Sequence, residues 1–196
     1  MTPMTSIRKI IFSCYAPLLT GLLAGSLAIG FAIPAGAHVT LEQPQAAAGS
    51  SYKAVLRVGH ACAGATSTTA ITVRLPAGFS SAKPVPKAGW TTTVQRSPLA
   101  QPYESHGRRV TEEVTAVSWQ AASPASALPG DFYDEFVVRG RLPATPGTLW
   151  FKVLQTCDVG AADWAQVPAS GASVKGLPLP AAPLEIVPAG HAGHNH

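Results

Sequence analysis

Proline and glycine interrupt this chain so often that no long helix fits between them. The sequence contains 18 residues of each type, and no helical period persists over a long window. Between the interruptions lie short segments in which apolar and polar residues alternate, which is the pattern of strands with one buried face. Several such segments at short intervals are typical of a sandwich, so we expect an all-β, antiparallel β-sandwich in one domain.

Six segments carry the strand pattern most clearly, and a seventh near the end adds a predicted edge strand. The predicted strands are residues 51–58, 69–75, 89–95, 110–119, 133–142, 149–156 and, at the edge, 184–187. Residues 96–109 are polar, and we expect them to form a loop or a hairpin tip.

The first 37 residues read as a secretory signal peptide. Arg8 and Lys9 form a positive start, an uncharged apolar run follows over 10–33, and Ala35-Gly36-Ala37 supplies the small residues of a cleavage site. An uncleaved membrane anchor is the alternative, because the run is long enough to span a bilayer. We expect cleavage after Ala37 and export to the periplasm or the medium.

Cleavage after Ala37 makes His38 the first residue of the mature protein, with a free α-amine. An α-amine titrates at about pH 8 and an imidazole at about pH 6.5, so both release a proton to a metal near neutral pH. The amine nitrogen and Nδ1 of one residue close a small chelate ring, a donor pair that suits Cu(II). The alternative is that a histidine occupies this position by chance and has no role in metal binding.

Three of the six histidines, His191, His194 and His196, lie in the last six residues. Short histidine-rich tracts bind metals, so this tail is a candidate secondary metal site, or else an inert end. The predicted organisation is a signal peptide over 1–37, the sandwich domain over 38–169, a proline-rich segment over 170–190 and the histidine tail over 191–196. No apolar segment after Ser170 is long enough for a membrane helix, so we expect no membrane anchor after cleavage.

Charge and cysteine content narrow the class of protein. The chain has 14 basic residues, Arg8 and Lys9 among them, and 10 acidic ones, with no basic stripe, which argues against a nucleic-acid partner. Cys14 leaves with the signal peptide, and Cys62 and Cys157 remain. In an exported protein such a pair forms a disulfide, and copper binding by the two thiolates is the alternative.

Short motifs in a fixed order resemble those of a known family. They are His38-Val39-Thr40, Gly59-His60-Ala61-Cys62, Leu75-Pro76-Ala77-Gly78, Pro84-x-Pro86-x-x-Gly89-Trp90, Tyr133-Asp134-Glu135-Phe136, Leu142-Pro143 and Gln155-Thr156-Cys157. Together they resemble the YcnI family of exported bacterial copper-binding proteins, over the stretch from His38 to about Trp164.

The resemblance implies a β-sandwich of cupredoxin or immunoglobulin-like shape. It also implies a Cu(II) site made by the amine and ring of the mature N-terminal histidine, a carboxylate and a nearby tryptophan. These correspond here to His38, Glu135 and Trp164, with Glu42 and Trp150 as reserves. The implied role is that of a copper chaperone or scavenger, with a copper transporter or another chaperone as partner.

Two other classes of function remain open. Copper oxidases of the polysaccharide monooxygenase type also use an N-terminal histidine, but they need a second one, for which His60 and His106 are the candidates outside the tail. We expect His60 instead to pack beside the disulfide. A metal-free extracellular interaction domain is the other class. No Ser-His-Asp spacing, phosphate loop or pair of catalytic carboxylates is present, so we expect no enzyme.

Overall fold

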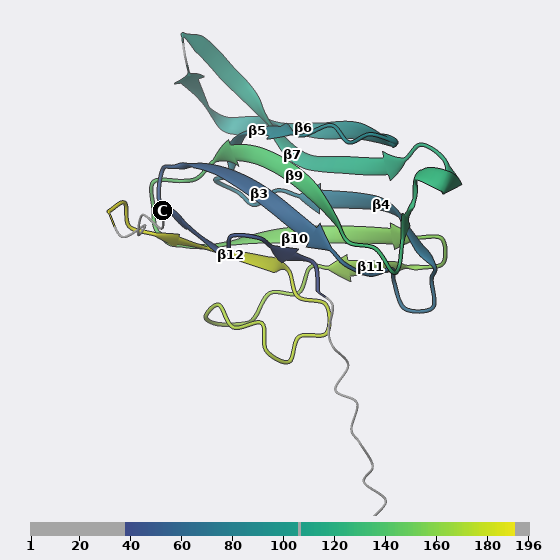
Figure 1. Cartoon of the computed structure of the whole chain (residues 1–196). Helices are drawn as coiled ribbons and strands as arrows, with labels where there is room; N and C mark the ends of the chain where they lie inside the picture. The colour runs from purple at the N-terminus through teal and green to yellow at the C-terminus, as the bar shows by residue number, and fades with distance from the viewer. Residues whose placement is uncertain (1–37, 106, 191–196) are drawn as a thin grey trace, which may run out of the picture. The chain divides into compact units, whose positions relative to one another are not determined.

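The computed structural model describes residues 38–105 and 107–190 (Figure 1). The predicted signal peptide at 1–37, His106 and the histidine tail at 191–196 lie outside the described residues. The described residues all belong to one compact unit.

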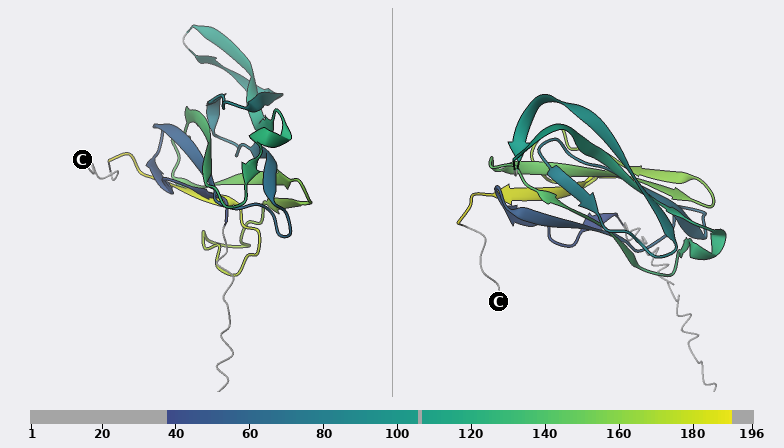
Figure 2. Two further views of the ribbon diagram at one scale, coloured as in Figure 1. Left: turned by 45° about the vertical axis from the view of Figure 1, so that its right-hand side comes forward. Right: turned by 90° about the horizontal axis from the view of Figure 1, so that it is seen from above.

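Two β-sheets form this unit (Figures 1 and 2). The smaller sheet has the order β1-β3-β9-β5, with bounds Thr40–Leu41, Ser51–Val58, Asp134–Arg141 and Ser80–Pro84. The larger sheet has the order β2-β12-β10-β4-β7-β6, with bounds Gln45–Ala47, Ala182–Val187, Gly147–Cys157, Ser67–Arg74, Arg108–Ala121 and Trp90–Ser105. Two short strands complete it, namely β11 (Ala161–Trp164) on β10 and β8 (Leu128–Pro129) on β4, after a 3-10 turn at Pro124–Ser126.

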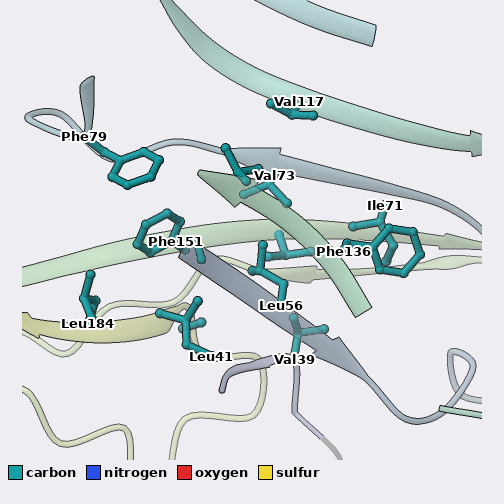
Figure 3. Packing of buried hydrophobic residues seen from close by; sticks show 14 of the residues in the cluster. Val39, Leu41, Leu56, Ile71, Val73, Phe79, Val117, Phe136, Phe151 and Leu184 are labelled. Atoms are coloured by element: carbon teal, nitrogen blue, oxygen red, sulfur yellow. The ribbon is translucent and has the colours of Figure 1, made fainter. Parts of the chain in front are cut away.

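The core lies between the two sheets and follows the alternation of the sequence. In β3, Tyr52, Ala54, Leu56 and Val58 are buried, whereas Ser51 and Lys53 are exposed. Figure 3 shows side chains of both sheets meeting in this layer, with Leu56 and Phe136 from the smaller sheet and Val73 and Phe151 from the larger one. The all-β sandwich predicted from the sequence is therefore confirmed.

The end of the chain departs from the expected arrangement. Strand β12 covers the predicted segment 184–187, but it lies between β2 and β10 and is not an edge strand. It also pairs with β2 in parallel, whereas the other paired strands described here are antiparallel. The larger sheet thus includes residues beyond position 169, within the proline-rich segment.

Residues 96–109, predicted as a loop or a hairpin tip, form the outer part of a hairpin, and most of them lie in strands and not in a loop. Strand β6 continues to Ser105, and β7 begins at Arg108, so the two form a long hairpin that projects past the other strands (Figure 1). The polar composition of this segment led to the prediction. Within the described residues, β6 is an edge strand paired with β7, and it accommodates Pro98 at an irregularity in the register.

A disulfide joins Cys62 to Cys157, with an S–S distance of 2.05 Å. Cys62 follows β3 of the smaller sheet, and Cys157 ends β10 of the larger one, so the bond links the two sheets. The predicted pairing is confirmed, and the alternative of two copper-binding thiolates is excluded for these cysteines. In the described residues, no helix is long and apolar enough to span a membrane.

Candidate metal centre

His38 and Trp164 come together at one end of the sandwich. His38 stands two residues before β1 of the smaller sheet, and Trp164 is the last residue of β11, which runs along β10 of the larger sheet. Their ring centroids are 5.7 Å apart with an interplanar angle of 62°, an edge contact. Trp164 is only 5% exposed, while His38 is half-buried.

The side chain of Gln155 fixes the position of the indole. Trp164 donates from Nε1 to Oε1 of Gln155 at 3.0 Å, and Nε2 of Gln155 donates to the carbonyl of His60 at 2.7 Å and to Oγ1 of Thr68 at 2.8 Å. Gln155 is completely buried, so these three bonds satisfy a polar group that would otherwise destabilise the fold. The indole therefore has one defined orientation toward His38.

His60 contacts the same indole from the loop after β3. Its ring centroid lies 5.9 Å from that of Trp164, with an interplanar angle of 79°, and its Nδ1 lies 2.6 Å from the carbonyl oxygen of Ala61. The disulfide at Cys62, two residues on, ties this loop to the end of β10. His60 was predicted to pack beside the disulfide, but its contact with Trp164 was not predicted, because β11 is too short to be recognised from its pattern.

Glu135 lies on β9, in the same sheet as the strand that follows His38. It pairs with Arg57 of β3, which in turn pairs with Thr40 of β1. Its Oε1 accepts a hydrogen bond of 2.7 Å from the hydroxyl of Tyr133. Within the described residues, no hydrogen bond or ion pair connects Glu135 with His38. The register thus places this carboxylate on the same sheet, two strands away from β1.

Tyr133 lies close to Gly59, Glu135 and Glu42. Its ring approaches Gly59, since a Cβ added there would lie 3.9 Å from Cδ2 of the tyrosine. Burial, followed by the hydrogen bond to Glu135, raises the pKa of the Tyr133 hydroxyl, which therefore stays protonated and donates to the carboxylate. The reserve carboxylate, Glu42, is exposed and raises the same pKa through its charge, so it too lies near Tyr133.

Trp150, the reserve tryptophan, belongs to another part of the sheet. It pairs with Pro183 in the β10–β12 ladder. The described residues contain no group of three or more His, Cys, Asp and Glu side chains arranged to hold a metal ion.

The family comparison agrees with this arrangement of elements. A family model described as "Domain of unknown function (DUF1775)" matches residues 38–186. The chain belongs to the DUF1775 family. This is the YcnI-like domain, so the resemblance seen in the ordered motifs is confirmed. The DUF1775 match begins at His38 and ends inside β12, which agrees with the place of β12 within the sheet.

A solved structure supports the fold of this DUF1775 chain. It is similar to an uncharacterized protein from Nocardia farcinica, whose crystal structure reveals an immunoglobulin-like fold. The two share 30% identity, the match covers 76% of this chain and 97% of that one, and the TM-score is 0.57. No curated protein matches the chain. The immunoglobulin-like sandwich is thus established, whereas neither comparison names a ligand of the site.

Proposed function

We propose that this DUF1775 protein is exported and binds one Cu(II) ion through the α-amine and imidazole of His38. In this proposal it acts as a periplasmic or secreted copper chaperone or scavenger that passes the metal to a transporter or another chaperone. The observation that carries the proposal is the contact of a half-buried His38 ring with the buried indole of Trp164.

The chemistry of the donors favours Cu(II) over softer or harder metals. Two nitrogens from one residue suit its tetragonal geometry. The Cys62–Cys157 disulfide leaves neither sulfur as a thiolate, so a blue-copper centre built on these cysteines is excluded. The indole of Trp164 shields one side of the imidazole from water and presents a π system to a nearby cation.

We assign the third donor to Glu135, with Glu42 as the alternative. A carboxylate adds the negative charge that a site of two neutral nitrogens lacks. The Tyr133 hydroxyl, which donates to Glu135, restricts the rotamers of that side chain. Such an outer hydrogen bond orients a ligand in many metal sites.

Copper titration of metal-free protein that begins at His38 tests the proposal. We expect one tight Cu(II) equivalent, a large loss of affinity in His38→Ala, and a smaller loss in Glu135→Gln. Glu112→Gln removes the same charge at an exposed position of β7, in the larger sheet, and serves as the matched control, with unchanged affinity. Equal affinity of His38→Ala and the unmodified protein would remove the basis of the proposal.

One observation favours a second candidate, a copper-dependent oxidase. His60 contacts the same indole as His38, and a second imidazole is what such oxidases need. His60→Ala separates the two functions. If the protein only binds copper through His38, this variant keeps its copper affinity and its Cu(II) spectrum, whereas a two-histidine centre loses a nitrogen ligand and its oxygen-dependent activity.

A further inference from the structure

The outer face of the smaller sheet carries a row of cations that face one another directly. Lys53 of β3 pairs with Arg139 of β9, which pairs on its other side with Lys83 of β5. Arg141 lies on the same face one step along β9. All four side chains are exposed, while Tyr52, Ala82 and Gly140 on the opposite face are buried. Like charges directly opposite one another destabilise a sheet, so this row is unfavourable unless an anion covers it.

Within the described residues no carboxylate forms an ion pair with this row, although Glu113 lies at its edge, where it accepts a hydrogen bond from the N–H of Ser81. The ion pairs found there are Arg74–Asp163 and Lys87–Asp134, and neither involves the row. On the same face of β9, Glu135 stands four residues from Arg139, about 13 Å along the strand. That separation exceeds the screening length of about 8 Å at physiological salt, so Glu135 neutralises little of the charge.

A concave surface lies beside the row. Its volume is about 300 Å³, and its polar lining consists of Lys83, Arg139, Arg141, Ser51, Ser81 and Ser105. Ser81 reaches this lining through a register irregularity between Ser80 and Lys83, and its backbone adopts φ 53°, an unusual value for a residue with a side chain. Its N–H donates a hydrogen bond of 3.1 Å to Oε2 of Glu113, and this bond stabilises the bend at Ser81.

We propose that this concave surface, defined by Lys83, Arg139, Arg141 and the three serines, binds an anion through a phosphate group. One guanidinium group can donate two parallel hydrogen bonds to two oxygens of a phosphate, and lysine and serine side chains add further donors. The volume lies at the lower end of the range for small-ligand sites, which fits a phosphate or phosphate ester better than a larger molecule. The phosphate belongs either to a free small molecule or to a lipid headgroup.

Paired variants of the full chain test the site. Lys83→Gln/Arg139→Gln removes two charges from the row, and Lys152→Gln/Lys175→Gln removes two from exposed positions elsewhere. One arm titrates inorganic phosphate into metal-free protein and follows backbone amide shifts by NMR. The other arm measures sedimentation with phosphatidylglycerol vesicles, with phosphatidylcholine vesicles as the neutral reference.

The row variant, Lys83→Gln/Arg139→Gln, loses two charge-assisted contacts, so its affinity for phosphate should be at least about tenfold lower than that of the unmodified protein. The control variant should keep the affinity of the unmodified protein. Phosphate shifts confined to β5 and β9 would identify a free anion as the ligand, and vesicle binding alone would identify a headgroup. The row variant should also have the higher melting temperature at low salt without anion, because the repulsion is relieved. Equal binding by the two variants, or no binding in either arm, would overturn the proposal.

Discussion

The imidazole of His38 meets the indole of Trp164 in an edge contact, with centroids 5.7 Å apart, and this contact joins the segment just before β1 of one sheet to the short strand β11 of the other. Gln155 and the Cys62–Cys157 disulfide hold the surrounding elements in place. The proposed copper site thus lies where buried hydrogen bonds and a disulfide link the two sheets, and removing either should lower the stability of the protein.

Replacing Gln155 by leucine should destabilise the protein by at least about 2 kcal/mol. Leucine has a similar size, but the change leaves Nε1 of Trp164 and the carbonyl of His60 without these buried partners. Urea unfolding followed by tryptophan fluorescence measures the loss. Gln120→Leu, at an exposed position of β7, is the matched control and should change stability by no more than about 0.5 kcal/mol. Equal effects of the two variants would show that Gln155 has no special role.

Removing the disulfide should cost about 2–5 kcal/mol, because it closes a loop between residues 95 positions apart. The double variant Cys62→Ser/Cys157→Ser and the reduced unmodified protein should unfold at the same lowered urea midpoint. A reducing agent should have no effect on the double variant. If reduction left the midpoint of the unmodified protein unchanged, the bond would contribute nothing to stability.

Asp158 should make a pH-dependent contribution to stability. The hydroxyl of Thr66, then the N–H of Ser67, donate to its carboxylate and lower its pKa. A carboxylate with a lowered native pKa stabilises the fold above the unfolded value of about 3.9, and this contribution disappears as the pH falls through the native value.

Asp158→Asn should therefore lower the urea midpoint at pH 7, and the difference from the unmodified protein should shrink as the pH falls below about 4. Asp131→Asn, at an exposed position, is the control and should show no such trend. A difference for Asp158→Asn that stays constant down to acid pH would contradict the assigned hydrogen bonds.

Ser81→Gly should stabilise the protein by about 0.5–1 kcal/mol. Ser81 has φ 53°, a conformation that glycine adopts without the strain a Cβ brings. Ser80→Gly tests the same change at a neighbouring position outside the positive-φ region and should be neutral or destabilising. Thermal unfolding of both variants measures the contrast, and a lower melting temperature for Ser81→Gly would count against strain at this residue.

The long strands were predictable from the sequence because their alternation is regular. The predicted strand at 51–58 coincides with β3, and every second residue of it lies in the core. The strands β1, β2, β8 and β11 have between two and four residues, too few for a period of two to stand out. Because Trp164 ends one of these short strands, alternation alone does not predict its contact with His38.

The candidate site was predicted in part. The resemblance to the family implied His38 and Trp164, which the structure brings together, whereas the contact of His60 with the same indole was not predicted. The row of Lys53, Arg139 and Lys83 was also missed. These three residues lie far apart in the chain, and only the strand register places them opposite one another, so a count of charges shows a nearly neutral domain.

The most direct test of the copper proposal is electron paramagnetic resonance of Cu(II) bound to protein whose first residue is His38, as verified by intact mass. The reference is the same protein with one leading glutamine that has cyclised to pyroglutamate, which leaves His38 in place but removes its free amine. We predict a tetragonal Cu(II) signal with nitrogen splitting in the first sample and its loss or marked alteration in the second. Identical spectra and affinities for the two samples would contradict a site built on the amine of His38.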